Sequence, residues 1–554
     1  MFEEIRFPHW LSVGFLQVSA LYSASQHIPD VNWDSQNTYT YSAYQFLNFR
    51  YYQDWLAGGL NGLNPPFLQI PNFILSHFGE WATTVYLISF LLVLQTLIYN
   101  LFLILFIIPA SSKMKTKDRV DLKSGKSSDL EVISSILSVF SLLSPLLLSE
   151  LGTTMGDWLA IPILVLGLIF FLMTIHLHSP LMLGASGFLF TAATCLKLSN
   201  APFLIAVVMT IISFAFTHAR DSLKRLSIFF LGSMVGVLLF SPWYLFIYKL
   251  TGNPIFPYYN AVFKSPYYAE VNARDLRWEL NSLSELSGLF RGTWTNNLLE
   301  FEARYLWWAF TILTVLLYFV VLGFQKFSTL RFFRKKSKGI EKLTQVEKHF
   351  VLYVIFAFLI WAKFFFYARY AMFVEMLLPA VCGVLIFKIF GKKSFRMQLI
   401  TSLGLLGLIF LHVPNWNLYQ APENTQTISK SLLTSDWKWQ IERQKIPEGP
   451  HNYYIDGECA CSFVLPSLGV DSSFLRLDNE IYGWVRTYPD RVKRKIDSGE
   501  FTRLISRGNS VEEVSRLNEL LKSISESRMI SIDDAKSVST LNGTIYVYKL
   551  IDKE

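Results

Sequence analysis

Long apolar runs alternate with short polar segments along residues 1–412. Most of these runs are close to the length that an α-helix needs to cross a hydrocarbon layer about 30 Å thick. The pattern therefore predicts a mainly α-helical, polytopic membrane protein with about eleven transmembrane helices. We expect these helices near residues 7–25, 83–109, 132–149, 158–176, 181–197, 201–217, 226–249, 305–324, 348–364, 371–390 and 397–412.

The charges of the connecting segments predict the orientation of these helices. Lys and Arg collect on the cytoplasmic loops of membrane proteins. If every predicted span is real, the basic segments all lie on that side together with the N-terminus, and they are 110–131, 218–225, 325–347 and 391–396. The longer loops 26–82 and 250–304 then lie outside, together with the C-terminal part of the chain.

Residues 413–554 differ in composition from the rest and predict a soluble extracytoplasmic α/β domain. Charged side chains are about twice as frequent there as in residues 1–412. Apolar residues with helical spacing follow an acidic first turn, and an Asn-Gly pair separates two strand-like runs. The expected elements are strands at 453–456 and 473–478, a helix at 511–526 and a hairpin at 540–550.

Composition excludes several classes of protein. Apolar and aromatic residues make up 52% of the chain and charged residues only 17%, where a soluble domain carries about 25%. A soluble enzyme, a secreted disulfide scaffold and a disordered chain are therefore excluded. The net charge of +8 is explained by cytoplasmic loops, so no nucleic-acid partner is expected. Cys459 and Cys461 form a CxC pair without the second half of a zinc site.

The first outer loop carries isolated charges, and ionisable groups at the edge of a membrane domain are costly enough to indicate function. Asp30 and Asp34 follow the first span directly. Arg50 and Asp54 come later and lie one helical turn apart. Since exposed ion pairs are common and weak, a solvated surface pair is the alternative for Arg50 and Asp54.

The second outer loop is a short turn between two spans. Glu150 ends the first span and Asp157 opens the next. Both carboxylates are therefore expected to face the same outer vestibule. Asp157 also suits the N-terminal cap of its helix, so a structural and a functional role are compatible.

Cations are expected on the same face. Lys197 ends the fifth span, Arg369 lies in a very short outer loop, and Arg277 belongs to the aromatic-rich loop after the seventh span. An Arg fork suits phosphate or carboxylate, although both residue types also serve as interfacial anchors. Glu375, inside the following span, requires a partner, for which Lys363 and Arg369 are candidates.

The order of these features resembles the GT-C superfamily of polytopic glycosyltransferases, and more narrowly an uncharacterised bacterial branch of GT-C-like membrane proteins. The segments that carry the resemblance are DSQNTYTYSAYQFLNFRYYQDWLAGGLNGLNPPFLQIP, SELGTTMGDWLA, CLKLSNAP, GNPIFPYYNAVFKSPYY with DLRW, and YARYAMFVEMLLP. Together they span most of residues 30–380. One departure is Thr40, which stands where the resemblance leads us to expect His.

The resemblance implies an enzyme of glycan biosynthesis in the cell envelope, located in the bacterial inner membrane. It implies that a sugar passes from a polyprenyl phosphate or diphosphate to a lipid, glycan or protein acceptor on the outer face. Asp34 would be the general base of an inverting displacement. The donor phosphate would be bound by Arg369 and Lys197, with Arg50 and Arg277 behind them. The residues that would orient the acceptor are Glu150, Asp157, Asp30 and Asp54.

The cofactor and two other functions stay open at this stage. Glu150 and Asp157 are candidates to hold a divalent cation, Mg or Mn, although a pair of carboxylates alone does not decide this. A glycan polymerase or ligase would use the same features to move an oligosaccharide. A non-catalytic transporter of a lipid-linked glycan would also need them, but is expected to place ionisable groups near the bilayer midplane at broken helices.

Overall fold

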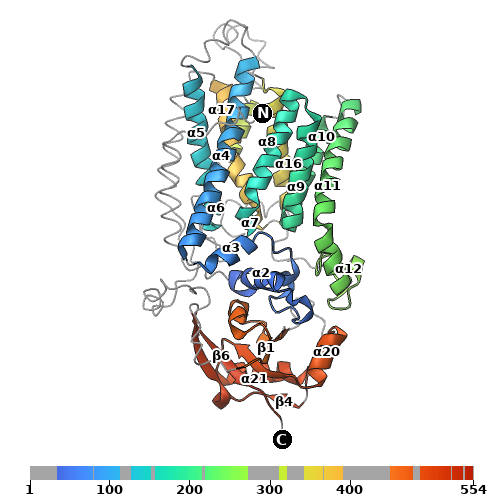
Figure 1. Cartoon of the computed structure of the whole chain (residues 1–554). Helices are drawn as coiled ribbons and strands as arrows, with labels where there is room; N and C mark the ends of the chain where they lie inside the picture. Colours follow the sequence, from blue (N-terminus) through green and yellow to red (C-terminus); the bar gives the residue numbers. More distant parts are fainter. Residues whose placement is uncertain are drawn as a thin grey trace, which may run out of the picture.

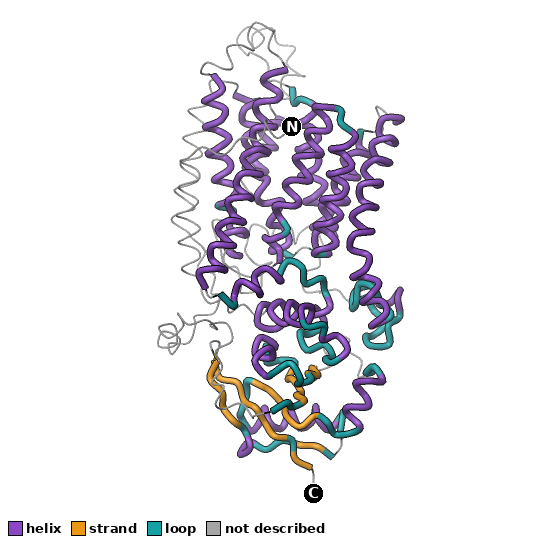
Figure 2. Tube along the Cα trace, viewed as in Figure 1, coloured by secondary structure: helices purple, strands orange, loops and turns teal. Residues whose placement is uncertain are grey.

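The computed structural model describes residues 34–78, 80–112, 126–150, 156–214, 219–272, 308, 311–320, 342–365, 367–390, 449–477, 487–525, 527–540 and 543–552. The described chain forms a bundle of helices at one end and a small sheet domain at the other, with the first loop between them (Figure 1). The strands are confined to the second end, where helices accompany them (Figure 2). The predicted spans 7–25 and 397–412 lie outside the described residues.

The bundle is built from apolar helices. They are α4 (Glu80–Ser112), α5 (Lys126–Leu142), α6 (Pro145–Glu150), α7 (Gly156–Leu159), α8 (Ile161–Leu177), α9 (Pro180–Leu196), α10 (Ala201–Ser213), α11 (Ala219–Thr251), α16 (Gln345–Phe364) and α17 (Met372–Phe390). Five stretches are long and apolar enough to cross a membrane, namely Val85–Phe106, Gly156–Leu177, Asp221–Thr251, Gln345–Phe364 and Arg369–Ile389. Shorter apolar helices, Pro180–Leu196, Leu198–Ser213 and Thr311–Val320, accompany them.

The span predicted at 132–149 is interrupted. Helix α5 ends at Leu142 and α6 begins at Pro145, a position where proline fits because the first turn has no intrahelical partner for an N–H. The backbone N–H of Leu146 donates to Glu375 Oε1 (3.0 Å), and Trp308 Nε1 donates to Glu375 Oε2 (3.1 Å). We expected Lys363 or Arg369 to be the partner of Glu375, and this expectation missed both donors. The N–H of Leu146 can donate to Glu375 because the break places it in the first turn of α6.

Helices α9 and α11 cross in close backbone contact. A Cβ atom built on Gly232 would lie 1.8 Å from the carbonyl oxygen of Gly184, and one built on Gly187 would lie 2.1 Å from that of Phe229. Small residues let membrane helices approach in this way. Side chains at these two glycines would push the helices apart.

The first loop contains short helical segments that cover one end of the bundle. They are η2 (Ser35–Tyr39), α2 (Thr40–Leu47), η3 (Arg50–Tyr52), η4 (Leu60–Leu63) and α3 (Ile70–Ser76). Segment η2 is a single turn of π-helix. This conformation is rare in proteins, and where it occurs it is often found at a functional site. After α11 the chain forms α12 (Asn260–Phe263) on the same side of the bundle (Figure 1).

The C-terminal domain is a mixed sheet with two helices. Its strand order is β2-β1-β3-β6-β5, with β1 parallel to β2 and β3, and β6 antiparallel to β3 and β5. The elements are β1 (Asn452–Asp456), η13 (Ser462–Leu468), β2 (Phe474–Leu477), α20 (Asp490–Asp497), β3 (Phe501–Ser506), α21 (Val511–Lys522), β5 (Lys536–Thr540), β6 (Gly543–Lys549) and a small sheet of β4 (Arg528–Met529) and β7 (Ile551–Asp552). The predicted strands at 453–456 and 473–478 are confirmed, the helix predicted at 511–526 ends at Lys522, and the hairpin predicted at 540–550 begins earlier, because its first strand is β5.

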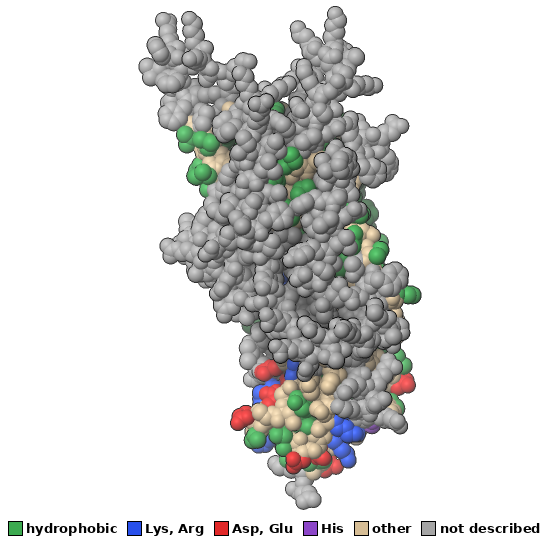
Figure 3. All heavy atoms as spheres, turned by 90° about the vertical axis from the view of Figure 1, so that its left-hand side faces the viewer, with side chains coloured by type: hydrophobic (Ala, Val, Ile, Leu, Met, Phe, Trp, Pro, Cys, Tyr) green, Lys and Arg blue, Asp and Glu red, His purple; other side chains and the backbone are tan. Residues whose placement is uncertain are grey.

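Two chemical features distinguish this domain from the bundle. Acidic and basic side chains gather over its end of the molecule (Figure 3), as the charge distribution of the sequence predicts. A disulfide joins Cys459 to Cys461 between β1 and η13. The two cysteines of the CxC pair are thus joined to each other.

Gly232→Ala should lower the thermal stability of the purified protein in detergent. The added methyl group meets the backbone of α9, which cannot move as a flexible side chain can, so we expect a cost of about 1–3 kcal/mol. Gly184→Ala is the matched control at the same crossing, since its Cβ finds the nearest atom at 3.8 Å. Equal melting temperatures for the two variants would contradict the close packing.

Candidate functional site

Five of the predicted site residues meet in one cluster at the ends of helices. Asp34 immediately precedes η2, Glu150 ends α6, and Asp157 is the second residue of α7. Lys197 follows α9, and Arg369 belongs to η9 (Ala368–Ala371), which leads into α17. The helix ends therefore bring together residues that are up to 335 positions apart in sequence.

Arg369 is the centre of this cluster. Its Nη1 lies 2.7 Å from Asp34 Oδ2, and its Nε lies 3.1 Å from Asp157 Oδ2 and 3.7 Å from Glu150 Oε1. Lys197 Nζ lies 2.5 Å from Asp157 Oδ1. Asp157 thus bridges the two cations with its two oxygen atoms, which fixes their spacing.

Tyrosine rings surround the cations. The guanidinium carbon of Arg369 lies 5.3 Å from the ring centre of Tyr367 and 5.6 Å from that of Tyr370. Lys197 Nζ lies 5.7 Å from the ring centre of Tyr370 and 5.8 Å from that of Tyr39. Both are distances at which a cation is attracted to an aromatic face. The rings shield the ion pairs from water and add apolar surface around them.

Tyr258, from the loop after α11, also belongs to this surrounding. Burial raises the pKa of its phenol, and the negative charge of Asp34 acts in the same direction. The same hydroxyl donates to Asn61 Oδ1 (3.1 Å). This bond connects the loop after α11 to the first loop.

Acids outnumber cations in the described part of this cluster. Among the described residues, three carboxylates face two cations. Burial raises the pKa of Glu150 well above its usual value, and the charge of Asp157 raises it further, while Arg369 and Lys197 act in the opposite direction. Glu150 is therefore the acid that retains its proton to higher pH, which leaves two aspartates opposite Arg369 and Lys197.

Gly156 makes room for this arrangement. A Cβ atom at that position would lie 3.0 Å from Gln69 Nε2 and 3.8 Å from Lys197 Cδ. Glycine thus allows the first loop and Lys197 to approach the start of α7, where Asp157 follows.

Arg50 and Asp54 lie elsewhere, in the contact between the first loop and the C-terminal domain. Arg50 Nε donates to Asp54 Oδ2 (2.6 Å), and its side chain is only 1% exposed. Its Nη1 donates to the carbonyl of Val470 (2.6 Å) and its Nη2 to that of Ser472. Asp54 Oδ1 accepts from the backbone N–H of Phe474 (2.9 Å). The pair therefore anchors the domain.

This placement corrects the sequence-based roles of both residues. We predicted Arg50 as a phosphate ligand and Asp54 as an orienting acid, with an exposed surface pair as the alternative. The pair is buried instead, because the segment before β2 covers it. The backbone of Trp55 pairs with Leu475 in parallel, so the first loop extends the sheet beside β2.

The remaining predicted residues have no place in the described site. Asp30 and Arg277 lie outside the described residues. Within the described part of the chain, no group of three or more His, Cys, Asp or Glu side chains is arranged to hold a metal ion. Glu150 and Asp157 are adjacent, but both are engaged with Arg369.

The tyrosines are the residues that sequence reasoning missed. Their signals are present as the runs NTYTY, FPYY and FFFYARY. In a chain with 26 Tyr and 47 Phe residues, such runs do not stand out from ordinary interfacial aromatics.

No protein-family model matches the sequence, and no curated protein is significantly similar to it.

Arg50→Met should detach or destabilise the C-terminal domain. Removing the cation leaves Asp54 buried without its partner, which costs about 3–5 kcal/mol. Thermal unfolding and limited proteolysis of the full chain measure the loss. Arg491→Gln should have a smaller effect, because Arg491 donates to the carbonyls of Tyr51 and Tyr52 from a half-buried position. Similar losses in both variants would contradict the anchoring role.

Thermal stability should decline as the pH rises through the elevated pKa of Glu150. The folded state holds this proton more tightly than the unfolded chain, so its contribution is complete below the unfolded pKa of about 4.3 and is lost above the folded value. Glu150→Gln, which cannot ionise, should flatten the decline in a melting series from about pH 5 to pH 9. Glu519→Gln, at an exposed position on α21, should keep the wild-type slope. A wild-type slope in Glu150→Gln would refute this assignment.

Proposed function

We propose that this protein is an integral-membrane glycosyltransferase that uses a polyprenyl-phosphate or diphosphate sugar. The observation that carries the proposal is the pair of cations, Arg369 and Lys197, held by carboxylates and surrounded by tyrosines at the ends of apolar helices. Cations in this setting suit a phosphate that gains charge as it leaves. Aromatic faces beside polar groups suit a sugar ring.

Asp34 is the proposed general base. In the resting protein Arg369 Nη1 lies 2.7 Å from Asp34 Oδ2, so this oxygen is occupied by the ion pair. The donor phosphate competes for the same guanidinium and releases Asp34. The freed carboxylate takes the proton of an acceptor hydroxyl while the acceptor oxygen bonds to the anomeric carbon. The bond from that carbon to the phosphate oxygen breaks, and Arg369 and Lys197 stabilise the departing phosphate.

The proposed location is the outer face of a bacterial inner membrane, with the N-terminus in the cytoplasm. The basic connecting segments favour this orientation. The disulfide between Cys459 and Cys461 supports it as well, because disulfides persist in oxidising compartments such as the periplasm. The acceptor is a lipid, glycan or protein that reaches the cluster from this side.

A transporter of a lipid-linked glycan is the second candidate, and one observation favours it. The break between α5 and α6 places a helix N-terminus inside the bundle, with Glu375 accepting from Leu146. Interrupted helices with buried carboxylates are typical of transporter binding sites. The five clustered residues lie at helix ends instead, which favours chemistry at the membrane surface.

Asp34→Asn should strongly reduce transfer and leave donor binding as tight as in the wild type or tighter. Loss of a general base lowers the rate by about 10²–10⁴-fold, whereas the neutral amide no longer competes for Arg369. The measurement uses nanodiscs and a panel of radiolabelled polyprenyl-phosphate and polyprenyl-diphosphate sugars. Arg369→Gln should weaken donor binding about tenfold or more, since a bond to a charged group contributes about 1.5–3 kcal/mol.

Controls keep the two candidate functions apart. Asp471→Asn and Arg494→Gln change exposed residues of the C-terminal domain and should leave transfer and binding unchanged. Consumption of no donor by the wild type, combined with protein-dependent movement of the lipid across vesicles, would replace the transferase with the transporter. Unchanged transfer in Asp34→Asn would remove Asp34 from the mechanism.

A further inference from the structure

Segment η2 lies between the cluster and the C-terminal domain and contacts both. On one side, Asp34 directly precedes the segment and pairs with Arg369, and Tyr39 ends it with its ring beside Lys197. On the other side, Gln36 and Asn37 are 5% and 2% exposed and face the C-terminal domain. The residues of this one turn therefore divide between two partners.

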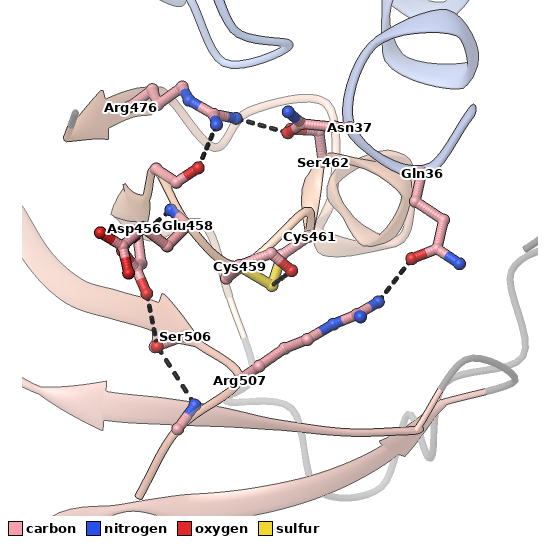
Figure 4. Close-up of a disulfide and its surroundings, with 12 residues drawn as sticks. Gln36, Asn37, Asp456, Glu458, Cys459, Cys461, Ser462, Arg476, Ser506 and Arg507 are labelled. Atoms are coloured by element: carbon pink, nitrogen blue, oxygen red, sulfur yellow. Dashed lines mark hydrogen bonds between the residues drawn. A yellow bond between two sulfur atoms is a disulfide. The ribbon is translucent and has the colours of Figure 1, made fainter. Parts of the chain in front are cut away.

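Two arginines of the C-terminal domain hold the amide side chains of η2 (Figure 4). Arg507, directly after β3, donates from Nη2 to Gln36 Oε1 (2.5 Å). Arg476, on β2, donates from Nη1 to Asn37 Oδ1, which also accepts from Ser462 Oγ (3.4 Å). A buried amide that lost its donor would cost about 1–3 kcal/mol. The conformation of η2 therefore depends on these donors.

Arg476 is itself fixed in place. It is 3% exposed, and its Nη2 donates to the carbonyl of Gly457 just after β1. Its backbone N–H donates to the carbonyl of Trp55 (3.3 Å), which connects it to the first loop that Arg50 and Asp54 anchor. A buried side chain on a sheet gives η2 a rigid support.

We infer that the C-terminal domain positions Asp34, with Arg507 and Arg476 acting as positioning residues through Gln36 and Asn37. The inference rests on the proposed function for its catalytic consequence, but its structural part is independent of it. The domain then serves the reaction without touching the reacting atoms. A displacement of about 1 Å at a catalytic group lowers a rate by about a hundredfold, so small movements of η2 are sufficient to matter.

Arg507→Ala is the variant that tests the inference, because Arg507 is exposed and its loss leaves the sheet intact. Hydrogen–deuterium exchange of the full chain in nanodiscs should rise about tenfold in residues 34–39 and stay unchanged in β1, β2 and β3. In the transfer assay, kcat should fall about 10–100-fold with KM within about twofold of wild type. Arg507→Lys, which keeps a cationic donor, should recover much of both effects.

A double variant and a control complete the test. Because Arg507 acts through Gln36, the effects of Arg507→Ala and Gln36→Ala on exchange should be far from additive when combined. Arg494→Gln, whose Nε donates to the carbonyl of Asp490 within α20, should change nothing. Unchanged exchange in residues 34–39, or a rise throughout the C-terminal domain, would overturn the inference. If no donor is consumed by the wild type, the proposed function fails and exchange alone decides the positioning role.

Discussion

The guanidinium of Arg369 is the group on which the arrangement of this site depends. It pairs with acids from the start of η2, the end of α6 and the start of α7. Each of these segments would otherwise leave a carboxylate at the edge of an apolar bundle, where an unpaired charge costs several kcal/mol. One cation thus contacts acids from three segments at once, and Lys197 adds a second positive charge beside Asp157.

Arg369 and Arg50 illustrate how the partners of a buried arginine indicate its role. Arg50 donates to Asp54 and to the carbonyls of Val470 and Ser472, and backbone carbonyls cannot leave without unfolding the loop. The ion-pair partners of Arg369 are carboxylates on side chains, for which an anionic ligand is a direct substitute. The first arginine is therefore suited to anchoring and the second to exchange of partners.

The sequence predicted the parts of this molecule that depend on local pattern. The apolar runs predicted most of the described helices of the bundle, and charges at or near the ends of these runs indicated Glu150, Asp157, Lys197 and Arg369. Asp34 came from its place in the first outer loop and from the resemblance. Alternation and turn residues located the strands of the C-terminal domain. These signals are carried within about twenty residues of the chain.

What the sequence did not predict depends on contacts between distant segments. The spacing of Arg50 and Asp54 is the same for an exposed pair and for one covered by residues more than 400 positions away. Glu375 was matched to nearby cations, because the prediction treats residues 132–149 as one continuous span and overlooks the helix start at Pro145, which leaves the N–H of Leu146 in need of an acceptor. Polar contacts between distant segments depend on how those segments pack against each other, and the periodicity of hydrophobic residues does not encode this packing.

The opposing contacts of η2 resolve a difficulty in the proposed role of Asp34 as a base. A carboxylate that must part from Arg369 to react would lose the bond that holds its segment in place. The bonds from Arg476 and Arg507 to Asn37 and Gln36 act on the opposite side of the same turn. They keep the backbone positioned when the ion pair opens, so Asp34 can change partners without changing place. In the proposed reaction, the C-terminal domain thereby contributes rigidity at the point where the helical bundle must release a bond.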